Sequence, residues 1–359
     1  MKCVVVGAGL VGMLTARELA CAGVEVVLLD RGRVGGEASW AGGGILSPLY
    51  PWKYSEPVNQ LARLGQQAYP NLVASLKAET GLDAELTNNG LLVLDPSEIE
   101  PGLEWSRNNG VAGERIDSVA VQQLEPEMAS QGPALWMPTV AQVRNPRLIK
   151  AVYAGLKYQG VTVVEGALIR ELARDGGRVR GVISSEGRYD ADCVVVCAGA
   201  WASQLLRQVG SAQPIVPVRG QMLLYKTEPG DCRHILLEGG QYLIPRRDGH
   251  LLVGSSVEFA GYSKETTVEK AQSLAEFGER IMPKLAKLPI VHHWAGLRPG
   301  TSSGVPYIGP VPGIGGLFVN AGHYRYGVVM APASAKLVAE LILGLPPTLP
   351  PSDYAAIPR

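Results

Sequence analysis

The first thirty residues of the chain alternate between short apolar runs and one glycine-rich turn. Residues 2–6 form an apolar run that predicts a buried strand, residues 10–22 predict a helix, and residues 25–30 predict a second strand that ends in an acid. Gly23 follows the helix, as is typical of a helix end. The order strand, helix, strand predicts a βαβ unit with two parallel strands at the start of an α/β fold.

Apolar periodicity, caps and turn residues predict elements along the rest of the chain. We expect further helices over residues 56–79, 145–159, 200–209, 266–282 and from 327 onward. We expect further strands over residues 90–95, 161–165, 179–184, 188–190, 193–197, 220–227, 241–245, 251–255 and 317–320. Thr266-x-x-Glu269 would be a capping box for its helix. Five prolines between residues 96 and 140 are expected to break any long element there.

The order of these elements predicts two interleaved domains. Strands 193–197 and 317–320 are both followed closely by Ala-Gly and look like parallel strands that rejoin the first sheet. Because 359 residues are many for a single core, two domains are expected. A Rossmann-like nucleotide-binding domain would comprise residues 1–80, 141–212 and 295–359. An inserted substrate domain, built from an antiparallel β-sheet and a helix, would comprise residues 81–140 and 213–294.

The turn after the first strand carries the pattern Gly-x-Gly-x-x-Gly. Within a βαβ unit this pattern indicates a dinucleotide site: Gly7 permits the tight turn, Gly9 lets the backbone approach a pyrophosphate, and Gly12 lets the helix pack closely on the strand. The N–H groups of the first helical turn would face the phosphates. Asp30, at the end of the second strand, would accept hydrogen bonds from a ribose diol. A βαβ unit that binds no ligand is the alternative.

A second glycine-rich run, residues 31–46, indicates FAD as the dinucleotide. A nicotinamide dehydrogenase normally enters another helix after its second strand, whereas this run is almost free of side chains for about a dozen residues. Such backbone can lie against a large flat group such as an isoalloxazine ring. A flexible surface loop is the alternative, but Ala38, Trp40, Ala41 and Ile45 are apolar where such a loop would be polar.

Charge and composition bear on which partners, metal sites and cellular compartment to expect. Lys+Arg and Asp+Glu number 33 each and the basic residues are scattered, which argues against nucleic acid as a partner. The five cysteines form no Cys-x-x-Cys pair and no metal-ligand spacing is found, so we expect no metal site and a reducing compartment. The N-terminus is read as a strand rather than a signal peptide, and the apolar segment 328–345 contains Lys336 and Glu340. A cytoplasmic protein without a membrane span is therefore expected.

Four stretches together resemble the D-amino-acid oxidase family of FAD-dependent oxidoreductases, and within it the glycine oxidases of the thiamine pathway. They are the glycine motif with Asp30; Gly36-x-Ala38-Ser39 through Leu46; Tyr242–Arg246 with Val253-Gly254; and Arg298–Gly300, Pro306–Gly309 and Gly322–Gly327. Many flavoproteins share the first stretch, whereas the last is much more specific. The resemblance covers nearly the whole chain. It implies noncovalent FAD, a small amino acid or amine as substrate, molecular oxygen as acceptor, and a homo-oligomer, by resemblance a homotetramer.

The resemblance also assigns roles at the substrate end of the site. Arg298 would grip the substrate carboxylate with Tyr242 beside it, and the bidentate fork of an arginine suits that task where a lysine does not. Arg325 and His323 would line the far side of the pocket, and for His323 we favour a structural hydrogen bond over a role as base. The alternatives are a surface salt bridge for Arg298 and a core position for Tyr242.

The expected cofactor-binding residues fall into groups along the chain. They are Gly7, Ala8, Gly9, Leu10, Val11, Gly12, Asp30 and Arg31; Ser39, Ala41, Gly42, Gly43, Gly44 and Leu46; Ile169, at the adenine end; Ala198, Gly199 and Trp201; and Arg298, Gly322, Tyr324, Arg325, Tyr326, Gly327 and Val328. The last helix begins near Gly327, so its positive end could lie at the flavin N1–C2 carbonyl and stabilise the reduced anionic ring.

Two pocket positions depart from the glycine oxidase pattern. Val257 and Leu46 stand where larger methionines are expected. Both changes would leave spare apolar room in the pocket, which a substrate with one or two extra methylenes could fill. Each buried methylene contributes roughly 0.8 kcal/mol.

The resemblance and the residues together predict an oxidase that converts glycine, or another small amino acid or amine, to the 2-oxo acid (glyoxylate from glycine), ammonia and hydrogen peroxide. Hydride would pass to flavin N5 while the neutral amine drives imine formation, so no side chain need act as a base. The alternatives are a D-amino-acid dehydrogenase, a sarcosine-type N-methyl amino-acid oxidase, and a non-catalytic dinucleotide-binding protein.

Overall fold

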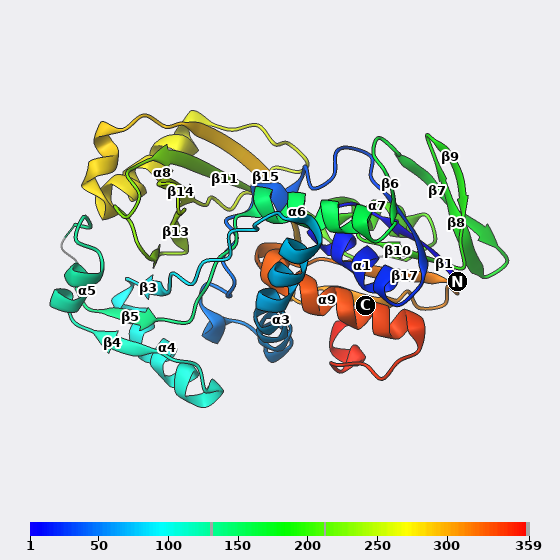
Figure 1. The fold of residues 1–359 in the computed structure, drawn as a ribbon, viewed down its shortest axis with the longest axis horizontal. Coiled ribbons are helices and arrows are strands. Elements are labelled where there is room, and N and C mark those ends of the chain that lie inside the picture. Colours follow the sequence, from blue (N-terminus) through cyan, green and yellow to red (C-terminus); the bar gives the residue numbers. More distant parts are fainter. Residues whose placement is uncertain (130–131, 212, 357–359) are drawn as a thin grey trace.

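Three β-sheets organise the residues that the computed structural model describes, 1–129, 132–211 and 213–356 (Figure 1). In the first sheet, β1 (Lys2–Val6) lies between β10 (Cys193–Val196) and β2 (Glu25–Leu29) and is parallel to both. The full order is β16 (Tyr307–Pro310), β17 (Leu317–Ala321), β10, β1, β2 and β6 (Thr162–Val164), with β16 antiparallel to its neighbour. The predicted Rossmann-like α/β class is confirmed, as is the return of strands 193–197 and 317–320 to the first sheet.

Different elements cover the two faces of this sheet, because side chains alternate between the faces along each strand. Cys3 and Val5 belong to a core shared with α1, α3, α6 and α9. Val4 and Val6 belong to a second core, shared with α7 and the three-stranded antiparallel sheet β7–β9. The bounds are α1 (Leu10–Cys21), α3 (Glu56–Thr80), α6 (Asn145–Tyr158), α7 (Ala202–Arg207), α9 (Gly327–Leu343), β7 (Ile169–Asp175), β8 (Arg178–Ser184) and β9 (Gly187–Asp190).

The eight-stranded sheet lies at the opposite end of the molecule from β7–β9 (Figure 1). Its order is β15 (His292–Gly300), β11 (Val216–Lys226), β14 (His250–Gly254), β13 (Gln241–Pro245), β12 (Ile235–Glu238), β3 (Leu91–Val93), β5 (Ala134–Met137) and β4 (Glu114–Ile116). Neighbouring strands are antiparallel except β12 and β3. Helix α8 (Val268–Ile281) packs Leu274, Phe277 and Ile281 into a third core with this sheet.

Two expectations about single elements are wrong. Helix α4 (Pro96–Asn109) has 14 residues where prolines were expected to prevent any long element. Pro96 lies in the first turn, where its missing N–H breaks no intrahelical bond. The N-cap of α8 is Thr267 rather than Thr266, and its Oγ1 accepts a hydrogen bond from Lys270 N at 3.4 Å. The residue pattern also did not reveal the strands β4, β5, β7, β12, β15 and β16.

The division into two interleaved domains stays a prediction. All strands of the eight-stranded sheet lie within residues 91–137 and 216–300, close to the two stretches expected for the inserted domain. Strand β15 nevertheless crosses the boundary expected at residue 294, because its pairing with β11 runs from His292 to Gly300.

The C-terminal segment packs back on the helical face of the first sheet. The Tyr354 ring is buried, and its hydroxyl donates to the carbonyl oxygen of Pro57 at 2.8 Å. This hydrogen bond ties the C-terminal segment to the start of α3. Residues 357–359 lie outside the described residues.

Helix α9 is apolar on most sides because it is a helix of the protein core. The stretch Tyr324–Leu343 has the length and hydropathy of a membrane span, but 67% of its apolar window is buried inside the protein. It packs against α1 and α3. Gly65 of α3 permits this contact, since a Cβ at that position would lie 1.8 Å from the carbonyl oxygen of Val329. We read the hydropathy of α9 as that of a buried helix.

Replacing Gly65 with alanine tests the packing of α3 on α9. In an exposed helix this change would stabilise the protein by up to about 1 kcal/mol. Here the added methyl meets backbone, so we expect a loss of about 1–3 kcal/mol from overpacking. Chemical denaturation of Gly65→Ala measures it, and Gln67→Ala, on an exposed turn of the same helix, is the control. A Gly65→Ala variant as stable as the parent would contradict the close approach.

Candidate functional site

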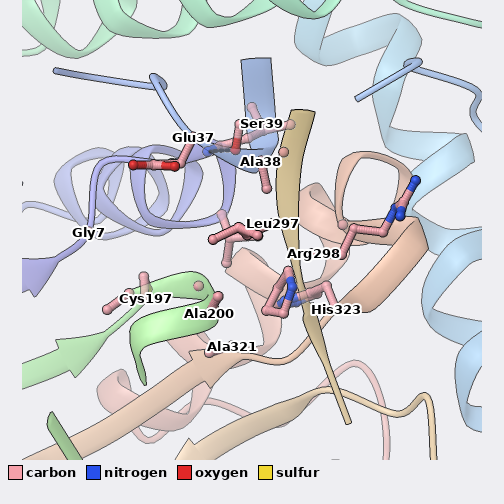
Figure 2. Close-up of a pocket in the computed structure, with 18 of the residues that line it drawn as sticks. Gly7, Glu37, Ala38, Ser39, Cys197, Ala200, Leu297, Arg298, Ala321 and His323 are labelled. Carbon is pink, nitrogen blue, oxygen red and sulfur yellow. Dashed lines mark hydrogen bonds between the residues drawn. The ribbon is translucent and has the colours of Figure 1, made fainter. Parts of the chain in front are cut away.

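A large cavity lies where the carboxyl ends of the first sheet meet the eight-stranded sheet (Figure 2). Val6, Leu29, Cys197 and Ala321 line it at the ends of four strands of the first sheet. Residues of β11, β13 and β15 line it from the other sheet. Ligands of open α/β sheets bind at this edge of the strands.

The glycine motif shapes one wall of the cavity. Gly7 has a φ of +106°, and a Cβ there would lie 2.4 Å from the carbonyl oxygen of Cys197. A Cβ on Gly12 would lie 1.8 Å from the carbonyl oxygen of Gly7, so Gly12 serves helix packing as predicted. The N–H groups of Gly9 and Val11 line the cavity and have no acceptor among the described residues. Unpaired N–H groups at the start of a 12-residue helix suit a phosphate.

Asp30 holds this wall in place and lines the cavity. Its carboxylate accepts hydrogen bonds from Ala8 N at 2.7 Å and Gly32 N at 2.8 Å. Burial raises the pKa of Asp30, although both N–H groups act in the opposite direction. Ser39 also stabilises this wall, because its hydroxyl accepts a hydrogen bond from Leu10 N at 2.8 Å.

The far end of the same wall is aromatic and charged. The Arg31 guanidinium lies 3.7 Å above the Trp201 ring, and Tyr262 stacks on Trp201 with ring centroids 5.5 Å apart. Lys264 forms an ion pair with Glu37 at 3.1 Å. Residues 262–264 thus cover part of the cavity that Arg31, Glu37 and Trp201 line.

The second glycine-rich run is irregular except for the short helix α2 (Ala38–Ala41). Gly42, Gly43 and Gly44 line the cavity on one side. On the other side they meet protein: a Cβ on Gly44 would lie 2.1 Å from the carbonyl oxygen of Val143, and one on Gly43 would lie 2.5 Å from Ile244 Cδ1. Arg246 Nη2 donates to the carbonyl oxygen of Gly43 at 2.8 Å. The glycines therefore serve close packing within the protein as well as the cavity wall.

Arg298 lies on β15 and is one of the residues that line the cavity (Figure 2). Its Nη1 donates to the carbonyl oxygen of Ser256 at 3.1 Å, and its Nη2 donates to Ser255 Oγ at 2.7 Å. Burial lowers the pKa of the guanidinium, and the nearby charge of Arg325 acts in the same direction. Gly220 on the adjacent strand makes room for it, since a Cβ there would lie 2.2 Å from both Nη atoms. Arg298 forms no ion pair with a carboxylate of the described residues.

Tyr242 and Arg325 complete the substrate end. The Tyr242 side chain is buried, its hydroxyl lies 4.0 Å from Met222 Sδ, and it also interacts with the Arg298 guanidinium. Arg325 Nη2 donates to the carbonyl oxygen of Gly240 at 3.0 Å, and Arg325 too forms no ion pair with a described carboxylate. Two guanidinium groups and one phenol hydroxyl thus face the cavity without an acidic partner.

His323 is part of a buried hydrogen-bond network at the start of α9. Its Nε2 lies 2.7 Å from Ser334 Oγ, and the Ser334 hydroxyl donates to Asn320 Oδ1. Asn320 Nδ2 in turn donates to Thr15 Oγ1 at 3.1 Å, which links β17 to α1. Burial lowers the pKa of His323 to about 3, so the imidazole is neutral near pH 7. This geometry supports the structural role that we favoured over that of a base.

Most of the expected site residues lie together around the cavity. The four that do not line it are Ala8, Gly12, Leu46 and Val257. Those that line it are Gly7, Gly9, Leu10, Val11, Asp30, Arg31, Ser39, Ala41, Gly42, Gly43, Gly44, Ile169, Ala198, Gly199, Trp201, Tyr242, Arg298, Gly322, His323, Tyr324, Arg325, Tyr326, Gly327 and Val328. Ala8 and Gly12 lie beneath the wall, where they serve the turn and the helix packing.

The two positions expected to enlarge the pocket require correction. Leu46 is 2% exposed and packs in the core of the first sheet rather than lining the cavity. Val257 is 44% exposed and is not among the lining residues. It lies in the irregular segment between β14 and α8, which turns its side chain toward solvent. The argument for spare apolar room from these two residues therefore has no structural support.

Several lining residues were missed by sequence reasoning. Glu37, Ser47, Leu49, Gly220 and Met222 all reach the cavity. Gly220 carried a usable signal, because a glycine inside a predicted strand marks a bulge or a close approach. Ser47 and Leu49 carried none, since they lie in irregular chain beyond the glycine run.

Comparison with known proteins decides the family. The family model named DAO, FAD dependent oxidoreductase, matches residues 2–341. The chain belongs to this family. Glycine oxidase of Pseudomonas aeruginosa is 46% identical over 363 residues, which cover 100% of this chain and 99% of that protein. Glycine oxidase of Pseudomonas putida is 45% identical over 98% of this chain and 97% of its own. The crystal structure of glycine oxidase from Geobacillus kaustophilus has a TM-score of 0.95 at 25% identity and covers 100% of this chain and 99% of its own.

FAD is the cofactor of this family, and the cavity fits it. Unpaired N–H groups at the start of α1 suit a pyrophosphate, and the Asp30 carboxylate beside them suits a ribose diol. Ile169 and Trp201 supply apolar surface at one end. The N-terminus of α9, at Gly327, lies at the other end, where its partial positive charge suits a reduced anionic ring.

Changing Asp30 tests the ribose assignment. Asp30→Ala removes a charged acceptor, and we expect FAD binding to weaken by about 1.5–3 kcal/mol for each ribose hydrogen bond lost. Titration of the apoprotein with FAD, followed by quenching of flavin fluorescence, gives the Kd. Asp30→Asn is the control, because it retains one acceptor for Ala8 N or Gly32 N while losing the charge. If the Kd of Asp30→Ala equalled that of the parent, Asp30 would not lie at the ribose.

The buried neutral His323 predicts how stability depends on pH. Its pKa falls from 6.5 in the unfolded chain to about 3 in the fold, so below pH 6.5 the unfolded chain binds a proton that the fold does not. Neutral His323 should therefore lower the free energy of unfolding by about 1.4 kcal/mol for each unit by which the pH falls, between roughly pH 6 and pH 4. Denaturation at several pH values should show a shallower pH dependence for His323→Gln than for the parent. The exposed His292→Gln variant is the control, and equal slopes in all three proteins would contradict the assignment.

Proposed function

We propose that this protein oxidises glycine, or another small amino acid or amine, to the 2-oxo acid, ammonia and hydrogen peroxide. The single observation that carries the proposal is the pair of unneutralised guanidinium groups, Arg298 and Arg325, in a cavity of an FAD-dependent oxidoreductase. Both arginines are half-buried, and withdrawing a cation from water without an acidic partner is costly unless an anion joins it. A substrate carboxylate would be that anion. The relatives that are 45–46% identical carry the name glycine oxidase, which agrees with this reading.

Arg298 is the better placed of the two for the carboxylate. Each of its Nη atoms uses one N–H on Ser255 or Ser256, which leaves a second N–H on each. Two such groups can bind both oxygens of one carboxylate, and the Tyr242 hydroxyl lies at the same end of the cavity. The roles of Arg298, Tyr242 and Arg325 in binding substrate are proposals, as are the individual FAD contacts.

The chain's own residues supply orientation rather than acid–base chemistry. FAD supplies the hydride acceptor when it is bound. Arg298 would fix the carboxylate, and the buried side chains of Tyr242 and Met222 would exclude water from the α-carbon. His323 is neutral and bonded to Ser334, and no other described histidine lines the cavity, which supports a mechanism in which no side chain takes the α-proton.

Three further properties belong to the same proposal. We propose that FAD is held noncovalently: Cys197 and His323 line the cavity, but burial raises the pKa of Cys197 to about 12 and His323 is hydrogen-bonded. We also propose that the protein is a cytoplasmic homotetramer. Involvement in the thiamine pathway rests on relatives such as the Bifunctional protein ThiO/ThiG of Synechocystis sp., 29% identical over 94% of this chain and 51% of that protein.

Turnover under air tests the proposed reaction and its alternatives. The purified protein should be yellow, and it should release one hydrogen peroxide per glycine oxidised. A faster reaction with sarcosine than with glycine would favour an N-methyl amino-acid oxidase. Reduction of an artificial electron acceptor without peroxide would identify a dehydrogenase. A bound flavin with no turnover on any amine would leave a non-catalytic binding protein and overturn the proposal.

Arg298→Lys tests the carboxylate role directly. Lysine keeps the charge and loses the fork, so one charge-assisted hydrogen bond worth about 1.5–3 kcal/mol should disappear. We expect KM for glycine to rise tenfold or more, while the much weaker reaction of a neutral amine of similar size changes little. Steady-state kinetics with both substrates measure the difference. Equal effects on the two substrates would reject the role.

A further inference from the structure

The guanidinium of Arg298 is held by a segment that leaves the regular sheet. Its two acceptors, the carbonyl oxygen of Ser256 and the hydroxyl of Ser255, lie at 3.1 Å and 2.7 Å, directly after β14 ends at Gly254. The Tyr242 side chain interacts with the same guanidinium from the cavity side. The direction of the Arg298 fork therefore depends in large part on the shape of residues 255–257, which supply both of these acceptors.

Residues 255–257 form a bulge against β11. Regular pairing of β14 with β11 ends at Gly254 opposite Met222, and pairing resumes with Glu258 opposite Arg219. The resumed pair exchanges two backbone hydrogen bonds, of 2.9 Å and 3.0 Å. Four residue steps on one side thus oppose three on β11, so one extra residue is accommodated. Bulges of this kind redirect groups next to active sites, and here the bulge turns two oxygen atoms toward Arg298.

The Glu258 carboxylate forms hydrogen bonds that hold the bulge in place, on the face of the sheet away from the cavity. Its Oε1 accepts from Ser256 Oγ at 2.5 Å and from Gln221 Nε2 at 2.9 Å, and its Oε2 accepts from Arg219 Nη2 at 2.7 Å. Ser256 Oγ also accepts a hydrogen bond from Gln221 N at 2.9 Å. Ser256 is therefore bound through its hydroxyl to Glu258 and through its carbonyl to Arg298.

Arg219 and Arg298 have opposite environments although their strands are adjacent. Arg298 pairs with Val218 across β15 and β11, so the neighbouring Arg219 points to the other face of the sheet. Arg219 and Glu258 form a pair that is largely shielded from solvent. Glu258 thus neutralises the charge of Arg219 on one face of the sheet. On the other face, Arg298 has no carboxylate partner among the described residues, so its charge is available to the cavity.

We propose that Glu258 is a positioning residue for substrate: by holding the bulge at residues 255–257, it fixes the guanidinium of Arg298 in the orientation that binds a carboxylate. The inference rests on the proposed function. Glu258 does not line the cavity, and it acts through Ser256. Without its carboxylate, the Ser256 hydroxyl loses its acceptor and Arg219 is left buried without its counter-ion. The bulge can then relax, and the Arg298 fork loses its fixed direction.

Glu258→Ala and Glu258→Gln, each as the FAD-loaded full chain, test this role. We expect KM for glycine and Kd for acetate, measured by the shift in flavin absorbance, to rise about tenfold in Glu258→Ala and less in Glu258→Gln. We expect kcat to stay within about threefold of the parent. The rate with glycine ethyl ester, which lacks the carboxylate, should be nearly unchanged. Glu269→Gln, the same change at an exposed position on α8, is the matched control and should leave all values unchanged.

Two results would overturn the inference while leaving the proposed function intact. One is parental KM and acetate Kd in Glu258→Ala; the other is equal loss with glycine and with the ester, which would mean a general structural role. If Glu258→Ala does not fold or retain FAD, Ser256→Ala replaces it, because it keeps the carbonyl bonded to Arg298 and removes the hydroxyl link. It should raise KM for glycine severalfold, and an unchanged KM would reject the role. A parent protein that neither oxidises glycine nor binds acetate would overturn the proposed function itself.

Discussion

The partial burial of an arginine without an acidic partner is the constraint on which the proposed substrate site depends. Moving the Arg298 guanidinium out of water carries a desolvation cost, which the protein partly offsets with the Ser255 hydroxyl, the Ser256 carbonyl and the nearby Tyr242 side chain. The remaining hydrogen-bonding capacity is directed into the cavity. A carboxylate that enters gains a charge-assisted contact that water cannot match there. The same arrangement explains why Gly220 has no side chain, because a methyl group would occupy the space of the guanidinium.

This arrangement requires two sheets to meet closely. The edge strand β15 lies against the second glycine-rich run: Trp294 Nε1 donates to the carbonyl oxygen of Ala41 at 3.1 Å, and a Cβ on Gly296 would lie 2.5 Å from Ala41 Cβ. Arg246 reaches from the end of β13 to the carbonyl oxygen of Gly43. The glycine-rich wall proposed for the cofactor and the arginine proposed for the substrate are therefore built on elements that touch directly. Hydride transfer requires such a fixed relation between the two ligands.

Sequence reasoning predicted the first sheet well because its signals are local. The run 2–6, the glycine motif and Asp30 each specify their own surroundings, and Gly7, Gly9 and Asp30 line the cavity while Gly12 serves the predicted helix packing; Ala8 supports the wall from beneath. Val257 and Leu46 failed for a different reason. Their surroundings depend on a bulge and on the path of an irregular loop, and neither has a residue pattern of its own. Helix α4 was missed because its prolines were taken as breakers, whereas Pro96 starts the helix and the helix continues through Pro101.

Residues that touch a ligand and residues that place them obey different rules, and only the first are visible to a family resemblance. In the proposed role Arg298 must be an arginine, because its planar fork can bind both oxygens of a carboxylate. Its direction is set by Ser255 and Ser256, whose conformation is set in turn by pairing on the far face of β11. Those supporting groups can be exchanged for others of similar shape without any change in the motif. Two proteins with the same contact residues can therefore differ in substrate affinity, and the cause will lie in how the sheet edge holds the arginine.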